Sequence, residues 1–161
     1  MRILALKTLV LGLGNPILTD DGVGIKVVRA LRPRVDDPQV TLHESSRGGL
    51  NLLDILAGYD RAIIVDAIQT RGGTAGDVYH LRASDFEPCL HVSCAHSVDF
   101  ATALELGRKI GLRLPRDITI VAVEVQDVIT FGEECTPLVQ VAINTAVDTV
   151  LQELESAVCA G

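Results

Sequence analysis

The first regular part of the chain reads Thr8-Leu-Val-Leu-Gly-Leu-Gly14, continues through Asn15-Pro16 and closes on Thr19-Asp20-Asp21-Gly22. An apolar run of this length predicts a buried β-strand over residues 8–13. The glycine, asparagine and proline that follow predict a turn. Apolar residues then recur at helical spacing, so a helix is expected over about 22–31. Strand, turn and helix in this order are typical of an α/β fold.

The rest of the chain alternates between the same two patterns. No helix fits between the third and fourth strands, so that pair is expected to be antiparallel and the mostly parallel sheet to be mixed. The last helix is expected to begin at Thr136-Pro137, a cap followed by proline at the first helical position. The expected strands are residues 8–13, 40–44, 62–66, 77–81 and 118–123, and the other expected helices are residues 22–31, 50–57 and 98–110.

Composition narrows the classes of protein that fit. The 161 residues, 48% hydrophobic but only 3% aromatic, predict one domain over 1–161 with an aliphatic core, residues 1–7 extending ahead of the first strand. A net charge of −7 without basic runs disfavours nucleic acid. The apolar stretches are too short for a membrane span, and a signal peptide is not indicated. The four cysteines form no Cys-x-x-Cys pair and are expected to be reduced thiols in a cytoplasmic protein.

Polar residues mark the ends of three apolar patterns. The pair Asp20-Asp21 follows the first strand, Asp66 closes the third, and His96 precedes the third helix. Ligands of parallel α/β sheets bind outside the carboxyl ends of the strands. An imidazole at a helix N-terminus should stay neutral, as a metal ligand must. Two carboxylates and one imidazole gathered there would form a three-ligand metal site with open positions.

Each of these residues also has an ordinary structural explanation. One of the two adjacent aspartates is expected to cap the first helix while the other points into the cleft. Asp66 could be a turn residue and His96 a structural histidine. Gly12-Leu-Gly14 invites a dinucleotide interpretation, but Ile17 stands where the third glycine belongs and the aspartates would repel phosphate. Cys94 and His96 could in principle form a Cys–His nucleophile. They are only two residues apart, however, a spacing at which side chains rarely face each other.

Four segments resemble the motifs of a known family, the maturation endopeptidases of nickel–iron hydrogenases. They span nearly the whole chain after Lys7, and the first is the most specific. The segments are Gly12-Leu-Gly-Asn-Pro-Ile-Leu-Thr-Asp-Asp-Gly-Val-Gly24, Ile64-Val-Asp66-Ala67, Ser93-Cys-Ala-His96 followed by Leu104, and Phe131-Gly-Glu-Glu-Cys-Thr-Pro137.

The resemblance implies a three-layer α/β/α fold and an endopeptidase, metal-dependent or aspartic-type. Such an enzyme would remove the C-terminal extension of a hydrogenase large-subunit precursor once nickel has been inserted. The family's metal-contacting positions carry over to Asp21, where members often have Glu, and to Asp66 and His96. Either Asp20 or Asp21 would serve as the base. Gly48-Gly49 falls in a loop linked to substrate discrimination.

The resemblance also implies that nickel arrives already bound to the precursor, although zinc or another divalent transition metal could occupy the site. The expected partner is therefore the nickel-loaded precursor, with neither nucleic acid nor membrane. Two other functions stay open at this point. One is a non-catalytic metal-binding or metal-delivery module, which a cleavage assay would distinguish. The other is a flavodoxin-like nucleotide or flavin binder, which an absorbance spectrum would identify.

Overall fold

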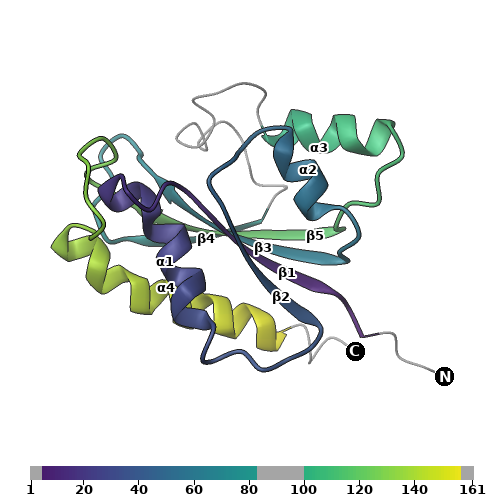
Figure 1. The fold of residues 1–161 in the computed structure, drawn as a ribbon, viewed down its shortest axis with the longest axis horizontal. Helices are drawn as coiled ribbons and strands as arrows, with labels where there is room; N and C mark the ends of the chain where they lie inside the picture. Colours follow the sequence, from purple (N-terminus) through teal and green to yellow (C-terminus); the bar gives the residue numbers. More distant parts are fainter. Residues whose placement is uncertain (1–4, 83–99, 157–161) are drawn as a thin grey trace.

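The structure, a computed structural model, describes residues 5–82 and 100–156, and Figure 1 shows its elements. Each expected strand and helix is found, although the expected third helix starts at residue 98, outside the described residues. In chain order the elements are β1 (Thr8–Leu13), the 3₁₀ helix η1 (Thr19–Gly22), α1 (Val23–Leu31), β2 (Val40–Ser45), α2 (Asn51–Leu56), β3 (Arg61–Ile68), β4 (Val78–Arg82), α3 (Phe100–Lys109), β5 (Asp117–Glu124) and α4 (Pro137–Ser156).

The described strands form a five-stranded sheet in the order β2-β1-β3-β5-β4. The pairs β1–β2, β1–β3 and β3–β5 are parallel, whereas β4 runs antiparallel to β5. The mixed sheet is therefore confirmed, but the antiparallel neighbour of β4 is β5 and not β3. The segment 69–77 carries the chain past the position that β5 fills, so β4 forms the edge of the sheet.

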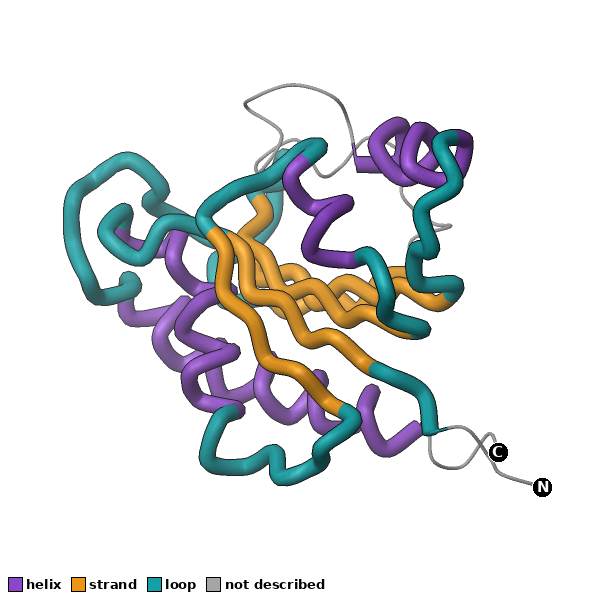
Figure 2. Tube along the Cα trace, turned by 45° about the vertical axis from the view of Figure 1, so that its right-hand side comes forward, coloured by secondary structure: helices purple, strands orange, loops and turns teal. Residues whose placement is uncertain are grey.

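Helices cover both faces of this sheet, which confirms the three-layer α/β/α architecture. Figures 1 and 2 show α1 and α4 on one face and α2 and α3 on the other. Every residue of β3 is buried because alternate side chains enter the two opposite cores. Ile63, Val65 and Ala67 belong to the core beneath α1 and α4, whereas Ala62 and Ile64 belong to the other.

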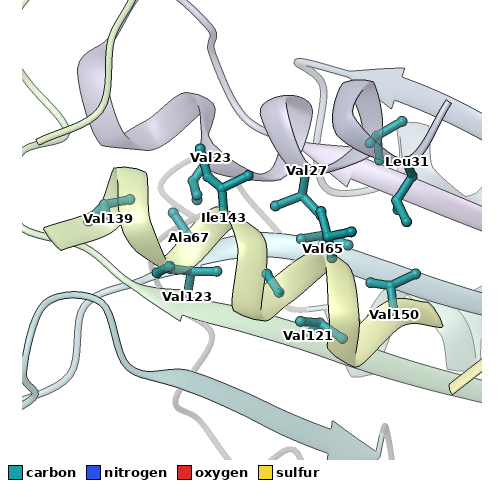
Figure 3. Packing of buried hydrophobic residues seen from close by; sticks show 14 of the residues in the cluster. Val23, Val27, Leu31, Val65, Ala67, Val121, Val123, Val139, Ile143 and Val150 are labelled. Carbon is teal, nitrogen blue, oxygen red and sulfur yellow. The ribbon is translucent and has the colours of Figure 1, made fainter. Parts of the chain in front are cut away.

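Aliphatic side chains build the core between α1, α4 and the sheet (Figure 3). Each fully buried Val, Leu or Ile contributes about 1.5–3 kcal/mol relative to an exposed one. Among the described residues, none of the helices combines the length and hydropathy that a membrane crossing needs. The labelled residues of this core are Val23, Val27 and Leu31 of α1, Val139, Ile143 and Val150 of α4, and Val65, Ala67, Val121 and Val123 of the sheet.

A buried ion pair fastens α4 to the amino end of the sheet. Arg61, at the start of β3, donates from Nη2 to the carboxylate of Glu153 and, at 2.6 Å, to its carbonyl oxygen. The Thr119 hydroxyl donates to the same carboxylate at 3.1 Å. His80 Nε2 lies 2.8 Å from Glu153 Oε2. Burial works to raise the pKa of Glu153, but the hydrogen bonds and charge of these partners outweigh it, so the pKa lies below its ordinary value.

We expect Glu153→Gln to lower the free energy of unfolding by about 3 kcal/mol at neutral pH, because it leaves the buried Arg61 with only the more exposed Asp117 as a counter-charge. The wild-type pKa is depressed, so this stabilisation is present above the ordinary pKa of a glutamate. This stabilisation is lost as the pH falls through the lower pKa that Glu153 has in the folded state. Urea unfolding at several pH values measures both effects.

The exposed Glu155, two residues further along α4, provides the control. Glu155→Gln should change stability by no more than about 0.5 kcal/mol. Equal effects of the two substitutions would contradict the role given to the Glu153 carboxylate. The same decrease of the free energy of unfolding at low pH in Glu153→Gln and in the wild type would also contradict it.

Candidate functional site

The chain reverses its direction of travel across the sheet between β1 and β3. From β1 it passes through α1 to β2 on one side, and it then returns through α2 to β3 on the other side. The two connecting helices lie on opposite faces. This arrangement is the topological switch point at which open α/β sheets bind their ligands, outside the carboxyl ends of the strands. The loop after β1 and the end of β3 meet at this point.

Two glycines let the loop after β1 fold back against η1. Gly14 has a φ of +137°, and a Cβ there would lie 1.9 Å from the carbonyl oxygen of Asp21. A Cβ on Gly22 would lie 2.7 Å from Pro16 Cα. Neither approach leaves room for a side chain, so these glycines determine how closely the loop and η1 pack.

The carboxylate of Asp21 is held by this fold of the loop. Its Oδ2 accepts a hydrogen bond from the backbone N–H of Asn15 at 2.9 Å. Burial raises the pKa of Asp21, and the Asn15 hydrogen bond only partly opposes that effect. Within the described residues, Asp21 forms no ion pair with a lysine, arginine or histidine. A carboxylate that is partly desolvated and lacks a counter-ion is chemically suited to contact a cation.

Asp66 lies inside β3, so the expectation that the strand ends at this residue is wrong. β3 stays paired with β5 through Ile68, whereas its last pair with β1 joins Val65 to Gly12. Asp66 therefore lies just beyond the paired part of β1, on the switch-point side. It is 5% exposed, and its Oδ1 accepts the backbone N–H of Ala67 at 2.8 Å.

The first turn of α1 rests directly on the ends of β1 and β3. A Cβ on Gly24 would lie 2.3 Å from the carbonyl oxygen of Val65 and 2.5 Å from that of Leu13. Glycine is therefore required for this approach. Because η1 leads into α1, the same contact brings the turn that carries Asp21 to the end of the sheet where Asp66 lies.

The carboxylate of Asp20 has very different surroundings from that of its neighbour. Asp20 is fully buried, and Oδ2 accepts backbone N–H groups of Gln126 and Asp127, each at 3.0 Å. Oδ1 accepts the N–H of Thr136 at 2.7 Å, and the Thr136 hydroxyl donates to Oδ2 at 2.8 Å. Asp20 therefore joins η1 to the exit of β5 and to the start of α4.

The expectation that one of the adjacent aspartates caps the first helix is wrong. The residue at the N-cap of α1 is Gly22, and it forms no side-chain capping bond. The reason is that η1 precedes α1 and turns Asp20 towards α4. At α4 itself the sequence signal is confirmed, since the helix begins at Pro137 and the carbonyl oxygen of Thr136 accepts the N–H of Gln140 at 2.9 Å.

Sequence reasoning missed that the segment 126–135 lies against η1 and the residue before it, and supports them from outside the site. Leu18 and Gly132 form an isolated parallel bridge, in which the N–H of Thr19 donates to the Gly132 carbonyl at 2.9 Å. The Thr19 hydroxyl donates to the Thr130 carbonyl at 2.5 Å, and Thr19 has a φ of +51°. The one indication in the sequence was that residues 131–137 resemble a family motif. The sequence does not show which residues lie next to this motif in space.

The loop that carries Gly48 and Gly49 also lies at the carboxyl end of the parallel strands. It joins β2 to α2, and Gly49 adopts a φ of +63°. The N–H of Gly14 donates to the carbonyl of Ser45 at 3.1 Å, which ties the exit of β1 to the exit of β2. This loop therefore adjoins the loop that leads to η1.

Other candidates from the sequence fall partly outside the described residues. His96 lies outside them, as do Cys89, Cys94 and Cys159. Cys135 is a buried free thiol whose pKa is raised by burial, and its Sγ donates to the Thr19 carbonyl at 3.8 Å. Within residues 5–82 and 100–156, no group of three or more His, Cys, Asp or Glu residues could hold a metal ion.

We expect Asp20→Asn to lower the free energy of unfolding by about 3 kcal/mol, because its amide NH₂ would face buried N–H groups that lose their charged acceptor. Thermal and urea unfolding measure the loss. Asp36→Asn, at an exposed position before β2, is the control and should change stability by no more than about 0.5 kcal/mol. A wild-type melting curve for Asp20→Asn would contradict the role given to this carboxylate.

Comparisons with known proteins agree with one another. A family model described as "Hydrogenase maturation protease" matches residues 25–153. The chain is 32% identical over 152 residues to the Hydrogenase 2 maturation protease of Escherichia coli (strain K12), covering 92% of this chain and 91% of the relative. The hydrogenase maturating endopeptidase HybD from E. coli has a similar structure, with a TM-score of 0.73, 27% identity and 94% of both chains covered.

A solution structure of an endopeptidase from Escherichia coli is also similar, with a TM-score of 0.81, 29% identity and 94% of both chains covered. The matched family model runs from within α1 to within α4, so it includes β3 with Asp66, whereas β1, the loop after it and η1 precede the first matched residue. The chain belongs to the hydrogenase maturation protease family.

Proposed function

We propose that this protein is the endopeptidase that removes the C-terminal extension of a nickel–iron hydrogenase large-subunit precursor after nickel insertion. The names of its relatives support the reaction class. The observation that carries the proposal is the position of Asp21 and Asp66. Both lie at the switch point between β1 and β3, and the partly buried Asp21 lacks a cationic partner among the described residues.

In this proposal Asp21, Asp66 and His96 contact the nickel ion that the precursor carries. Carboxylate oxygen and imidazole nitrogen are suitable ligands for nickel, zinc and related divalent ions. No such group of three lies wholly within the described residues, so the contact requires His96 or ligands supplied by the substrate. The nickel of the precursor is thus treated as part of the substrate, and zinc or another divalent ion could take its place.

Cleavage adds one water molecule across the scissile peptide bond. Its oxygen bonds to the carbonyl carbon, and the C–N bond breaks as the leaving amine takes up a proton. A metal ion held beside the carbonyl can polarise it or activate the water. Asp21 is the better candidate for accepting the proton, because its partly buried carboxylate accepts only the hydrogen bond from Asn15 among those of the described residues and burial raises its pKa.

Asp20 has a positioning role in this proposal and not the role of the base. Both of its oxygens already accept hydrogen bonds from Gln126, Asp127 and Thr136. Gly48 and Gly49 are proposed to contribute to substrate discrimination, since their loop adjoins the exit of β1. The reaction is proposed to occur in the cytoplasm.

The loop after β1 disfavours the alternative of a flavodoxin-like nucleotide binder. Phosphate-binding loops present free backbone N–H groups to the anion. Here the N–H of Gly14 donates to Ser45, and the N–H of Asn15 donates to the carboxylate of Asp21. A non-catalytic metal-delivery module remains the second candidate, because the same carboxylates would serve it.

The decisive experiment incubates the purified protein with the nickel-loaded precursor and follows the mass of the precursor by mass spectrometry. We expect loss of a C-terminal fragment from the nickel-loaded precursor and none from the nickel-free one. Nickel transfer without cleavage would favour the delivery module. Equal cleavage of both precursors would contradict metal recognition by the site.

We expect Asp21→Asn to reduce cleavage by at least about 100-fold without lowering the melting temperature. Even partners that only support metal ligands often cost 10–100-fold when they are changed. Burial raises the pKa of Asp21, so its stabilising contribution is present at low pH and is lost as the pH rises through the raised value. At neutral pH the neutral asparagine should therefore give an equal or higher melting temperature.

Three further variants make this test sharper. Asp21→Glu keeps the carboxylate and should retain part of the activity, whereas Asp66→Ala and His96→Ala should lose it. Circular dichroism reports whether each variant is folded. If Asp21→Asn melts normally and still cleaves at the wild-type rate, Asp21 has no place in the site.

A further inference from the structure

Large apolar side chains are exposed on the two segments that Asp20 joins. Ile17, in the loop after β1, is 48% exposed. Ile129 and Phe131, in the segment between β5 and α4, are 83% and 80% exposed. Surface residues of this kind usually need no explanation singly, but a group of them beside a functional site is typical of an interaction surface. We call Ile17, Ile129 and Phe131 the apolar rim.

Hydrogen bonds place Ile17 beside the segment that carries Phe131 and fix the turn that carries Ile129. The N–H of Gly132 donates to the carbonyl of Ile17 at 2.9 Å, and Leu18 pairs with Gly132 in the parallel bridge. Ile17 and Phe131 therefore occupy equivalent positions, each one residue before the bridged pair. The carboxylate of Asp127 accepts the N–H of Ile129 at 3.1 Å and fixes the turn that carries it. A surface held in this way would lose little conformational entropy on binding.

Negative charge adjoins the apolar rim. Glu133 and Glu134 follow Phe131 after one glycine, and both are exposed. Within the described residues neither of them forms an ion pair. Lys26 donates from Nζ to the backbone carbonyl of Glu133 and does not pair with its carboxylate. The complementary partner would present an apolar side chain flanked by lysine or arginine.

The apolar rim is continuous with the candidate site. Ile17 lies between Asn15, which hydrogen-bonds the Asp21 carboxylate, and Asp20, which clamps the segment 126–136. We propose that the apolar rim, with Glu133 and Glu134, docks a basic segment with an apolar anchor on the hydrogenase large-subunit precursor, separate from the scissile peptide. This inference rests on the proposed function, because it takes the precursor as the partner.

The test measures binding to an immobilised nickel-loaded precursor by biolayer interferometry. We expect Phe131→Ser to raise the dissociation constant at least tenfold, and Glu134→Lys to raise it comparably at low salt with a smaller effect at high salt. Ile110→Ser and Glu155→Lys are the matched controls, because Ile110 is 65% exposed at the end of α3 and Glu155 is exposed on α4. Both controls should stay within twofold of the wild type.

Cleavage kinetics on the same precursor provide the second readout. Docking away from the scissile bond predicts that Phe131→Ser raises KM at least tenfold and leaves kcat within twofold. Unchanged binding and KM in both Phe131→Ser and Glu134→Lys, with cleavage intact, would overturn the docking surface alone. Binding that depends on Phe131 in a protein that never cleaves the precursor would support docking and overturn the proposed function.

Self-association is the competing use of an exposed apolar group. Sedimentation velocity of the wild type and of Phe131→Ser distinguishes it. A monomeric wild type supports docking to the precursor. A wild-type dimer that Phe131→Ser converts to a monomer would overturn the proposal, because the apolar rim would then be covered by a second copy of this chain.

Discussion

The buried carboxylate of Asp20 is the interaction on which the geometry of the candidate site depends. It accepts hydrogen bonds from Gln126, Asp127 and Thr136, which lie more than a hundred residues further along the chain. Hydrogen bonds to a charged acceptor in dry surroundings are stronger than neutral ones. They also satisfy backbone N–H groups at the exit of β5 and before α4, which would otherwise be buried without partners. The left-handed backbone of Thr19, at a φ of +51°, is tolerated because bonds on both sides hold it.

The adjacent aspartates show how one short turn can serve both stability and chemistry. Asp20 accepts hydrogen bonds from several donors and fixes the turn through them. Asp21 faces one backbone donor, and burial raises its pKa, so at neutral pH its charge costs the folded state free energy. Groups that are electrostatically unfavourable in the free protein are common at functional sites, where the ligand supplies the missing charge. The turn η1 can present such a group only because Asp20 fixes it from behind.

Local patterns in the sequence were sufficient to predict every strand and α-helix that the structure describes, but not the 3₁₀ helix η1. Hydrophobic alternation and helical spacing are local properties, and the missing helix between β3 and β4 correctly indicated a mixed sheet. The neighbour of β4 could not be predicted. The strand that pairs with β3 at this side is β5, and this choice depends on the packing of the whole sheet. The same limit applies to the site. The carboxylates after β1 and within β3 could be identified as candidates, but the contacts of Asp20 across the molecule have no local signature.

The two ends of the sheet differ in how their charges are satisfied. At the amino end, Arg61 and Glu153 are both buried and bonded to each other, and Thr119 and His80 supply further contacts. The ion pairs of this cluster are formed within the chain, and they fasten α4 to the strands. At the carboxyl end, Asp21 is partly buried with a raised pKa, and Glu133 and Glu134 lack ion-pair partners among the described residues. Asp21, Glu133 and Glu134 lie beside the β1–β3 switch point and the apolar rim, so a partner that brings cations and apolar surface would supply there the contacts that these described residues lack.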